Sequence, residues 1–192
     1  MHSEPSRKLV KQELRDRMRR TRRELQSATR EQLDPAINGH LLEYVQAHAI
    51  TTVAAFMSFD GEPDILPAMR TLADSGVLVA LPVVTDAPGK PTMEFRRWDR
   101  ACEMRANRYG IAEPAGTPEM HALELDLVLV PLVAWDASGG RLGMGASFYD
   151  RFFQPYASAD RPRRVGMGYR AQQVAAVPLD PWDVRLHGVI SE

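Results

Sequence analysis

Glycines and arginines cluster in the segment 136–151, which follows the strongest strand signal of the chain and precedes a predicted helix start. A strand, a glycine loop and a helix in this order aim backbone N–H groups and a helix N-terminus at one point, which suits an anion. Arg141 and Arg151 bracket the loop and can add charge-assisted hydrogen bonds to phosphate oxygens. Asp150 could hold a Mg²⁺ ion that bridges two phosphates. The segment matches neither the P-loop nor the dinucleotide fingerprint, so a tight connection without a ligand stays the alternative.

A second loop with chemistry-bearing residues, 58–64, ends the apolar run 51–59. In open parallel α/β sheets, ligands bind beyond the carboxyl ends of the strands, where both loops would lie. Glu62 could accept hydrogen bonds from the amidine-like edge of a heterocycle or assist proton transfer. The alternative for an acid in such a turn is a cap on the next helix, and we expect Asp64 to be one.

Ser147 raises a rival interpretation from another enzyme class. It lies on the predicted strand-to-helix turn, in half of a G-x-S-x-G nucleophile elbow, and acids followed by His187 come after it in hydrolase order. Those acids are Asp160, Asp180 and Asp183. The second glycine of the elbow is Tyr149 here, and the chain is short for that fold, so a serine hydrolase is the weaker interpretation.

The charge distribution is uneven although the net charge of the 192 residues is −1. The segment 7–30 holds ten basic residues and three acids, so the rest of the chain is acidic. A basic segment on an acidic body suggests an anionic partner, either nucleic acid or a phosphorylated ligand. The single cysteine, Cys102, excludes an intrachain disulfide, and no apolar run is long enough to span a membrane. We expect a soluble, cytoplasmic protein.

Hydrophobic periodicity predicts the elements that position these residues. Apolar residues at steps of three and four indicate a basic amphipathic helix over 7–26, and a second helix is expected over 34–48, with Asp34 as its N-cap. Strand patterns cover 51–59, 77–84, 92–98, 126–135 and 164–169; helix patterns cover 64–75 and 171–177; 109–118 reads as irregular and 178–192 as a closing tail. The β-α-β order predicts one domain over 1–192: an α/β fold, a three-layer α/β/α sandwich with a mostly parallel central sheet.

Five ordered segments resemble the 5-formyltetrahydrofolate cyclo-ligase family, also called methenyltetrahydrofolate synthetases. The longest is PLVAWDASGGRLGMGASFYDR, residues 131–151. Shorter matches are KQELR at 11–15, FMSFDGE at 56–62, YGIAEP at 109–114 and Trp182-Asp183. Together they cover nearly the whole chain.

The resemblance implies a Rossmann-like fold and a set of site residues. Lys11 and Arg15 would contact the phosphates of ATP, and Asp150 and, less firmly, Asp183 would hold Mg²⁺. Arg141, Tyr149 and Asp150 would be the catalytic residues. The loop that cradles the triphosphate would comprise Arg141, Leu142, Gly143, Met144, Gly145, Ala146, Ser147, Phe148 and Tyr149. The folate pocket would be lined by Met57, Glu62, Tyr109 and Phe148.

The implied reaction is the ATP-dependent closure of 5-formyltetrahydrofolate to 5,10-methenyltetrahydrofolate. We expect a monomer whose partner is the reduced folate, and we expect it to bind neither nucleic acid nor membranes. A relative that keeps the nucleotide site but acts on another substrate, or only binds, is the main alternative. Nucleic-acid binding has no recognisable motif behind it. Two departures matter: Ser147 replaces a family glycine, and His187 replaces an aspartate of many relatives. If the backbone at Ser147 needs a positive φ, the serine would be strained.

Overall fold

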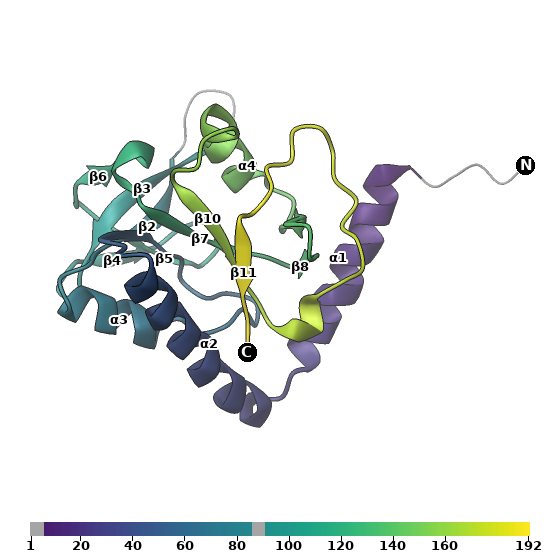
Figure 1. The fold of residues 1–192 in the computed structure, drawn as a ribbon, viewed down its shortest axis with the longest axis horizontal. Helices are drawn as coiled ribbons and strands as arrows, with labels where there is room; N and C mark the ends of the chain where they lie inside the picture. The colour runs from purple at the N-terminus through teal and green to yellow at the C-terminus, as the bar shows by residue number, and fades with distance from the viewer. Residues whose placement is uncertain (1–5, 86–90) are drawn as a thin grey trace, which may run out of the picture.

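A seven-stranded sheet forms the centre of the molecule in a computed structural model that describes residues 6–85 and 91–192 (Figure 1). Its strand order is β11-β10-β7-β1-β2-β3-β6. The strands β11 (Gly188–Ile190), β10 (Arg163–Met167), β7 (Leu127–Pro131), β1 (Thr52–Ala54) and β2 (Leu78–Thr85) are parallel neighbours. The strands β3 (Thr92–Trp98) and β6 (Glu119–Met120) pair antiparallel at one edge. The predicted mostly parallel sheet is confirmed.

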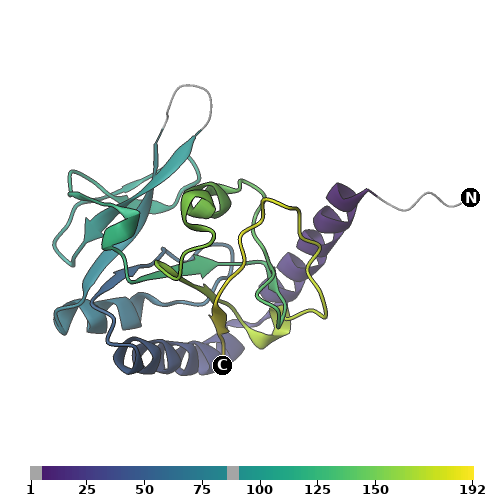
Figure 2. The same ribbon diagram turned by 45° about the horizontal axis from the view of Figure 1, so that its top comes forward.

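Two helices cover one face of the sheet and a third covers the other (Figure 2). Apolar side chains of α2 (Ser27–Ala47) and α3 (Leu66–Asp74) pack with Val53, Leu81 and Leu129 in the larger core cluster. On the opposite face, Phe153 of α4 (Phe148–Phe153) packs in a second cluster with Ala54 and Val128. Alternate residues of each strand thus serve opposite layers, as a sheet buried on both faces requires. The fold is the predicted three-layer α/β/α sandwich.

The basic helix α1 (Arg7–Glu24) lies beside the sheet, against its carboxyl end (Figure 1). Leu14 and Met18 bury its apolar stripe in a third cluster with Val133 and Leu142. Leu142 belongs to β9 (Arg141–Leu142), which forms a separate hairpin with β8 (Ala134–Trp135). The predicted amphipathic helix is therefore confirmed, and it docks on the hairpin that opens the glycine loop.

The helix predicted over 34–48 begins earlier, at Ser27, and Pro35 lies inside it, so the prediction of Asp34 as N-cap is wrong. Proline deprives the helix of one N–H donor. Leu33, however, lies on the same face as Ile37, Leu41 and Val45, and all of them pack in the core. Burial of this continuous stripe outweighs the lost hydrogen bond.

Two predicted strands are shorter in the structure. The run 51–59 contributes only β1, and the run 126–135 divides into β7 and β8 after Pro131, because proline has no N–H with which to continue the ladder. The reverse holds for two segments predicted to lack strands. The irregular region contains β5 (Ala112–Pro114), which pairs with β4 (Met104–Ala106), and the closing tail contains β11.

The smaller elements follow the predictions in part. The helix predicted over 171–177 is a single 3₁₀ turn, η3 (Arg170–Gln172), and two further 3₁₀ turns are η1 (Ala122–Glu124) and η2 (Gln154–Tyr156). The N-cap of α3 is Ile65 rather than the expected Asp64, although Asp64 Oδ1 accepts from the Leu66 N–H at 3.1 Å, one residue before the cap. Within the described residues, every helix is too short or too polar to cross a membrane.

Candidate active site

The two predicted loops meet at the switch point of the sheet. Strands β1 and β7 are parallel neighbours, and the chain continues from β1 to β2 on one side and from β7 to β10 on the other. A crevice beyond the carboxyl ends of two such strands is the usual ligand site of open α/β sheets. The loop 55–64 leaves β1 there, and the segment 132–150 leaves β7.

Asp136 shapes the turn of the β8–β9 hairpin ahead of the glycine loop. Its buried carboxylate accepts from the N–H and hydroxyl of Ser138 at 2.8 and 2.7 Å, from the Gly140 N–H at 3.0 Å, and from the Val177 N–H at 2.7 Å. Burial alone would raise the pKa of Asp136, but these hydrogen bonds outweigh it and hold the pKa below its usual value. The hairpin is thereby a fixed base for the loop that follows.

The glycine loop itself is exposed and contains left-handed backbone. Residues 144–147 are exposed, Gly145 has a φ of +102°, and Ser147 has φ +53° and ψ +28° directly before α4. The Ser147 hydroxyl makes no capping hydrogen bond. The serine thus occupies a conformation that favours glycine, which is the strain anticipated from the sequence.

Two of the predicted cations, Arg15 and Arg141, belong to or contact this loop. Arg15 donates from Nε to the Gly143 carbonyl at 2.9 Å, and its guanidinium carbon lies 3.7 Å from where a Cβ on Gly145 would be. Arg141 is buried and donates to Asp150 Oδ1 at 2.6 Å and to the Val184 carbonyl. The structure therefore brings Arg15, Arg141 and the loop together.

Lys11 reaches the site through the C-terminal segment. Its Nζ lies 2.6 Å from Asp180 Oδ2 and 2.5 Å from Asp183 Oδ2. Burial would lower the pKa of Lys11, but its hydrogen bonds to the two aspartates prevail and raise that pKa. The amine is thus charged and anchored one helical turn before Arg15, on the side of the helix that faces the loop.

Asp150 and Asp183 have oxygen donors suited to Mg²⁺. Oδ1 of Asp150 also accepts from the Val184 N–H at 3.1 Å, which places it next to the residue that follows Asp183. No group of three or more metal-ligating side chains occurs in the described ranges. Mg²⁺ ordinarily uses one or two carboxylates together with substrate phosphates and water, so this donor set fits that ion in that mode.

A buried carboxylate, Glu62, and a buried phenol, Tyr149, interact electrostatically. The Glu62 side chain is only 8% exposed, lies 3.6 Å from Arg22, and accepts from the Phe59 N–H at 3.2 Å. Burial raises its pKa to about 7, against the opposing effects of Arg22 and that N–H. The Tyr149 hydroxyl is buried without a hydrogen-bond partner among the described residues, and burial and then the charge of Glu62 raise the Tyr149 pKa. Buried hydroxyl groups are ordinarily hydrogen-bonded, so the unpartnered Tyr149 hydroxyl is a candidate contact for a polar ligand.

The other predicted pocket residues are less clearly assembled. Met57 is half-buried and packs on the larger core cluster. Phe148 carries the Arg151 guanidinium 5.2 Å from its ring centre. Tyr109 is 47% exposed, and in the described part of the chain no hydrogen bond or ring contact joins it to Glu62 or the glycine loop.

Arg151 donates to the carbonyls of Ala146 and Pro91 at 2.8 and 3.1 Å, so it braces the loop. One sequence interpretation needs correction. His187 is not a base for Ser147, because its Nδ1 accepts from the Arg164 N–H at 2.9 Å and its Nε2 lies 2.7 Å from the Arg164 guanidinium. The hydrolase arrangement is therefore not formed.

The sequence analysis missed Arg22 and Asp60. Arg22 is completely buried and donates to the Asp60 and Leu132 carbonyls at 3.0 Å each, which ties the two loops together. Asp60 also binds Arg19 and Arg23. Arg22 follows Arg15 by seven residues and therefore lies on the same face of α1. That spacing was the sequence signal that could have assigned Arg22 to the site.

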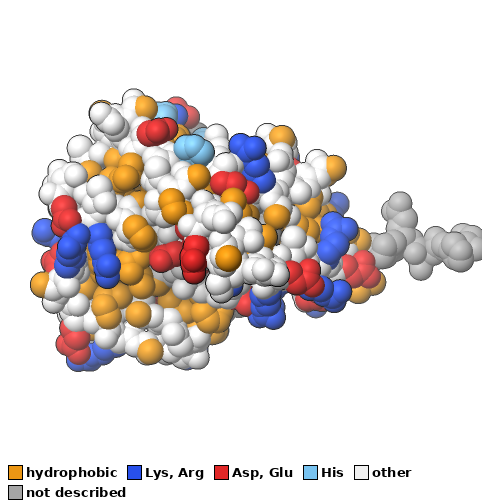
Figure 3. All heavy atoms as spheres, turned by 90° about the horizontal axis from the view of Figure 1, so that it is seen from below, with side chains coloured by type: hydrophobic (Ala, Val, Ile, Leu, Met, Phe, Trp, Pro, Cys, Tyr) orange, Lys and Arg blue, Asp and Glu red, His pale blue; other side chains and the backbone are white. Residues whose placement is uncertain are grey.

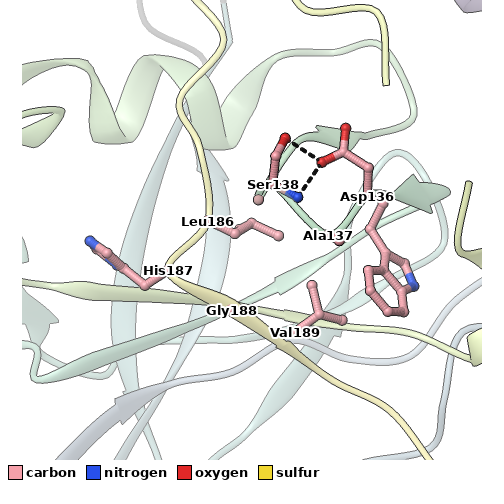
Figure 4. Close-up of a pocket in the computed structure, with 9 residues that line it drawn as sticks. Asp136, Ala137, Ser138, Leu186, His187, Gly188 and Val189 are labelled. Carbon is pink, nitrogen blue, oxygen red and sulfur yellow. Dashed lines mark hydrogen bonds between the residues drawn. The ribbon is translucent and has the colours of Figure 1, made fainter. Parts of the chain in front are cut away.

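A pocket of about 260 Å³ lies outside this site, between the hairpin turn and the segment 186–189 (Figure 4). Asp136 and Ser138 line it and bond to each other, whereas His187 points away from them. None of the predicted site residues lines it.

The geometry places this chain among open α/β proteins in which two loops meet at the switch point of the sheet. A model of the 5-formyltetrahydrofolate cyclo-ligase family matches residues 7–192. The chain is 32% identical to the 5-formyltetrahydrofolate cyclo-ligase of Haemophilus influenzae over 94% of this chain and 96% of that protein. It is also 32% identical to the Escherichia coli K12 enzyme of the same name, over 91% of this chain and 96% of that protein. The chain belongs to the 5-formyltetrahydrofolate cyclo-ligase family.

Solved structures agree with the observed fold. The Aquifex aeolicus 5,10-methenyltetrahydrofolate synthetase superposes with a TM-score of 0.79 at 26% identity, over 94% of this chain and 89% of that one. The Mycoplasma pneumoniae 5,10-methenyltetrahydrofolate synthetase shares the fold with a TM-score of 0.76 at 23% identity, over 94% of this chain and 98% of that one.

Proposed function

We propose that the chain converts 5-formyltetrahydrofolate and ATP to 5,10-methenyltetrahydrofolate, ADP and phosphate. The observation that carries this proposal is that the glycine loop, with Arg15 and Arg141, and the loop that bears buried Glu62 leave neighbouring parallel strands at one switch point. The first group of residues suits a polyphosphate and the second suits a heterocycle with N–H groups. Family membership supports the same substrate.

The reaction needs activation of a poor electrophile. The formyl oxygen attacks the γ-phosphorus of ATP, the bond to ADP breaks, and the formyl carbon becomes electrophilic. N10 of the same molecule then attacks that carbon, loses its proton, and phosphate leaves with the formyl oxygen. Ring closure within one bound molecule benefits from a high effective molarity, about 10⁵ M or more in well-oriented cases.

The residues of the site have distinct proposed roles in these steps. Lys11, Arg15, Arg141 and the loop N–H groups would hold the triphosphate and stabilise charge on the transferring phosphoryl group. Mg²⁺ held by Asp150, with Asp183 nearby, would neutralise phosphate oxygens when bound. Glu62 would accept from the N–H edge of the folate, in a pocket that the resemblance extends to Met57, Tyr109 and Phe148. The Tyr149 hydroxyl would donate to a substrate oxygen, since no described residue uses it.

The cations of α1 favour this proposal over nucleic-acid binding. Arg19, Arg22 and Arg23 all bind Asp60, and Lys11 binds two aspartates, so these charges are paired within the protein. The face seen in Figure 3 carries acidic and basic side chains interspersed rather than one continuous basic field. A nucleic-acid surface needs a basic stripe that follows phosphates outside the protein.

The test is turnover by the purified protein. We expect 5-formyltetrahydrofolate, ATP and Mg²⁺ to give the methenyl chromophore, with one ADP per methenyl group formed. ADP formation without the chromophore, or ATP binding without turnover, would favour a relative that acts on another substrate. Affinity for nucleic acid that falls steeply with salt, without turnover, would favour the third interpretation.

A further inference from the structure

Arg22 is completely buried, although the docking of α1 does not need a buried arginine. Its side chain is 0% exposed, although Leu14 and Met18 already anchor α1 through an apolar cluster. Burying a guanidinium is costly unless every donor is satisfied, and an apolar residue of similar volume would hold a helix equally well. The arginine is thus placed for its contacts.

Those contacts converge on the substrate side of the switch point. The guanidinium donates to the Asp60 carbonyl and carboxylate, at 3.0 and 3.1 Å, and to the Leu132 carbonyl at 3.0 Å. Its NH1 atom also lies 3.6 Å from Glu62 Oε1. One side chain therefore connects the ends of β1 and β7 and reaches the carboxylate assigned to the folate.

The same helix face carries the cations assigned to ATP. With about 100° of rotation per residue, Lys11, Arg15 and Arg22 fall within about 40° of one another around α1. At about 1.5 Å per residue, Arg22 lies about 10 Å along the axis from Arg15. A rigid helix thus spaces the phosphate contacts from the folate contact.

We propose that Arg22 is a positioning residue for the proposed reaction: it orients the Glu62 carboxylate toward the folate, in register with the phosphate site. This inference rests on the proposed function for its substrate. Arg22 acts on the folate through Glu62 and does not touch the reacting atoms.

The groups that interact electrostatically with Glu62 come from three elements. Arg22 belongs to α1, Asp60 and the Phe59 N–H to its own loop, and Tyr149 to α4. Arg22 is the one cation among these described groups, and its charge opposes the burial that favours protonated Glu62. Removing it leaves Glu62 more protonated at neutral pH.

The test compares Arg22→Met with Arg23→Met. Arg23 also binds Asp60, but its side chain is 57% exposed, so it is the matched control. For Arg22→Met we expect KM for 5-formyltetrahydrofolate to rise by about tenfold or more, as for loss of a charge-assisted contact to a buried group. KM for ATP should stay within about twofold, and higher pH should recover part of the loss. Arg23→Met should change neither constant.

A double-mutant cycle separates positioning from a general structural role. In a Glu62→Gln background, Arg22→Met should add almost nothing to the loss, since both changes remove one interaction. Full additivity, or an equal rise in both KM values, would overturn the proposal.

A measurement without turnover keeps this inference distinct from the proposed function. The Glu62 carboxyl, followed by ¹³C NMR in folded protein, should titrate at higher pH in Arg22→Met than in wild type and be unmoved in Arg23→Met. An unchanged Glu62 titration would overturn the role of Arg22, whereas a wild-type protein without turnover would overturn the proposed function alone.

Discussion

Replacing Ser147 by glycine tests whether the glycine loop stores backbone strain. The φ of +53° and ψ of +28° put Ser147 in the left-handed region, which costs a non-glycine residue about 1–2 kcal/mol. Glycine also has more conformational freedom in the unfolded chain, which destabilises the folded protein by about 0.4–1 kcal/mol and offsets part of the relieved strain. No capping hydrogen bond is lost, because the Ser147 hydroxyl makes none. We expect Ser147→Gly to stabilise the protein by about 0.5–1 kcal/mol.

Thermal and urea unfolding measure this difference. For a protein of this size, about 1 kcal/mol corresponds to about 2–4 °C in Tm. Ala49→Gly is the positive control, since Ala49 has a φ of +49° after α2 and lies outside the site. Ala146→Gly is the negative control: it is exposed in the same loop without a positive φ, so it should lose about 0.4–1 kcal/mol.

One pattern would refute the reasoning. If Ala49→Gly stabilises the protein while Ser147→Gly destabilises it as much as Ala146→Gly does, the serine is not strained in solution. In the enzyme assay, Ser147→Gly should leave KM for ATP unchanged or lower, because the backbone N–H groups stay in place.

Three further predictions concern single side chains. Lys11→Ala should raise KM for ATP by about tenfold, through loss of a charge-assisted phosphate contact, and spare that for folate; steady-state kinetics test this, and an unchanged KM for ATP would contradict it. The pKa of Glu62 is raised from 4.5 to about 7, so between these pH values the folded protein holds a proton on Glu62 that the unfolded chain has released. Wild-type stability from this group therefore falls as pH rises through that window, and Glu62→Gln should gain about 2 kcal/mol at pH 8 but not at pH 5, by urea unfolding. Equal gains at both pH values would exclude this origin. Asp136→Asn should lose about 2–3 kcal/mol, because an amide cannot accept all four bonds. The pKa of Asp136 is lowered, so the wild-type advantage is full above the unfolded pKa of about 3.9 and should shrink on acidification to pH 3; a constant gap would contradict this.

The predictable part of the fold was its periodic part. The strand β3 lies where the alternation placed it, and α1 ends within two residues of the predicted boundary. The start of α2 was missed because Asp34-Pro35 reads as a helix start, whereas burial of Leu33 extends the helix by two turns before it. Proline is a local signal for a helix boundary, and here tertiary packing outweighs that signal.

The site was predictable in composition and less so in its connections. The glycine loop and Glu62 stand beyond the strands that were expected to precede them. The partners of Arg22, at positions 60, 62 and 132, are far away along the chain, and no local spacing reveals them. Hydrophobic patterns count every arginine as a surface residue, so a completely buried one is found only when the fold is known.

The fate of the formyl oxygen tests the central claim most directly. The account has that oxygen attack ATP and leave with phosphate, so 5-formyltetrahydrofolate labelled with ¹⁸O in the formyl group should transfer its label to the phosphate released in a single turnover. Mass spectrometry of that phosphate gives the answer. Labelled phosphate is the predicted result; unlabelled phosphate, with the methenyl product formed and the label in water, would contradict the account.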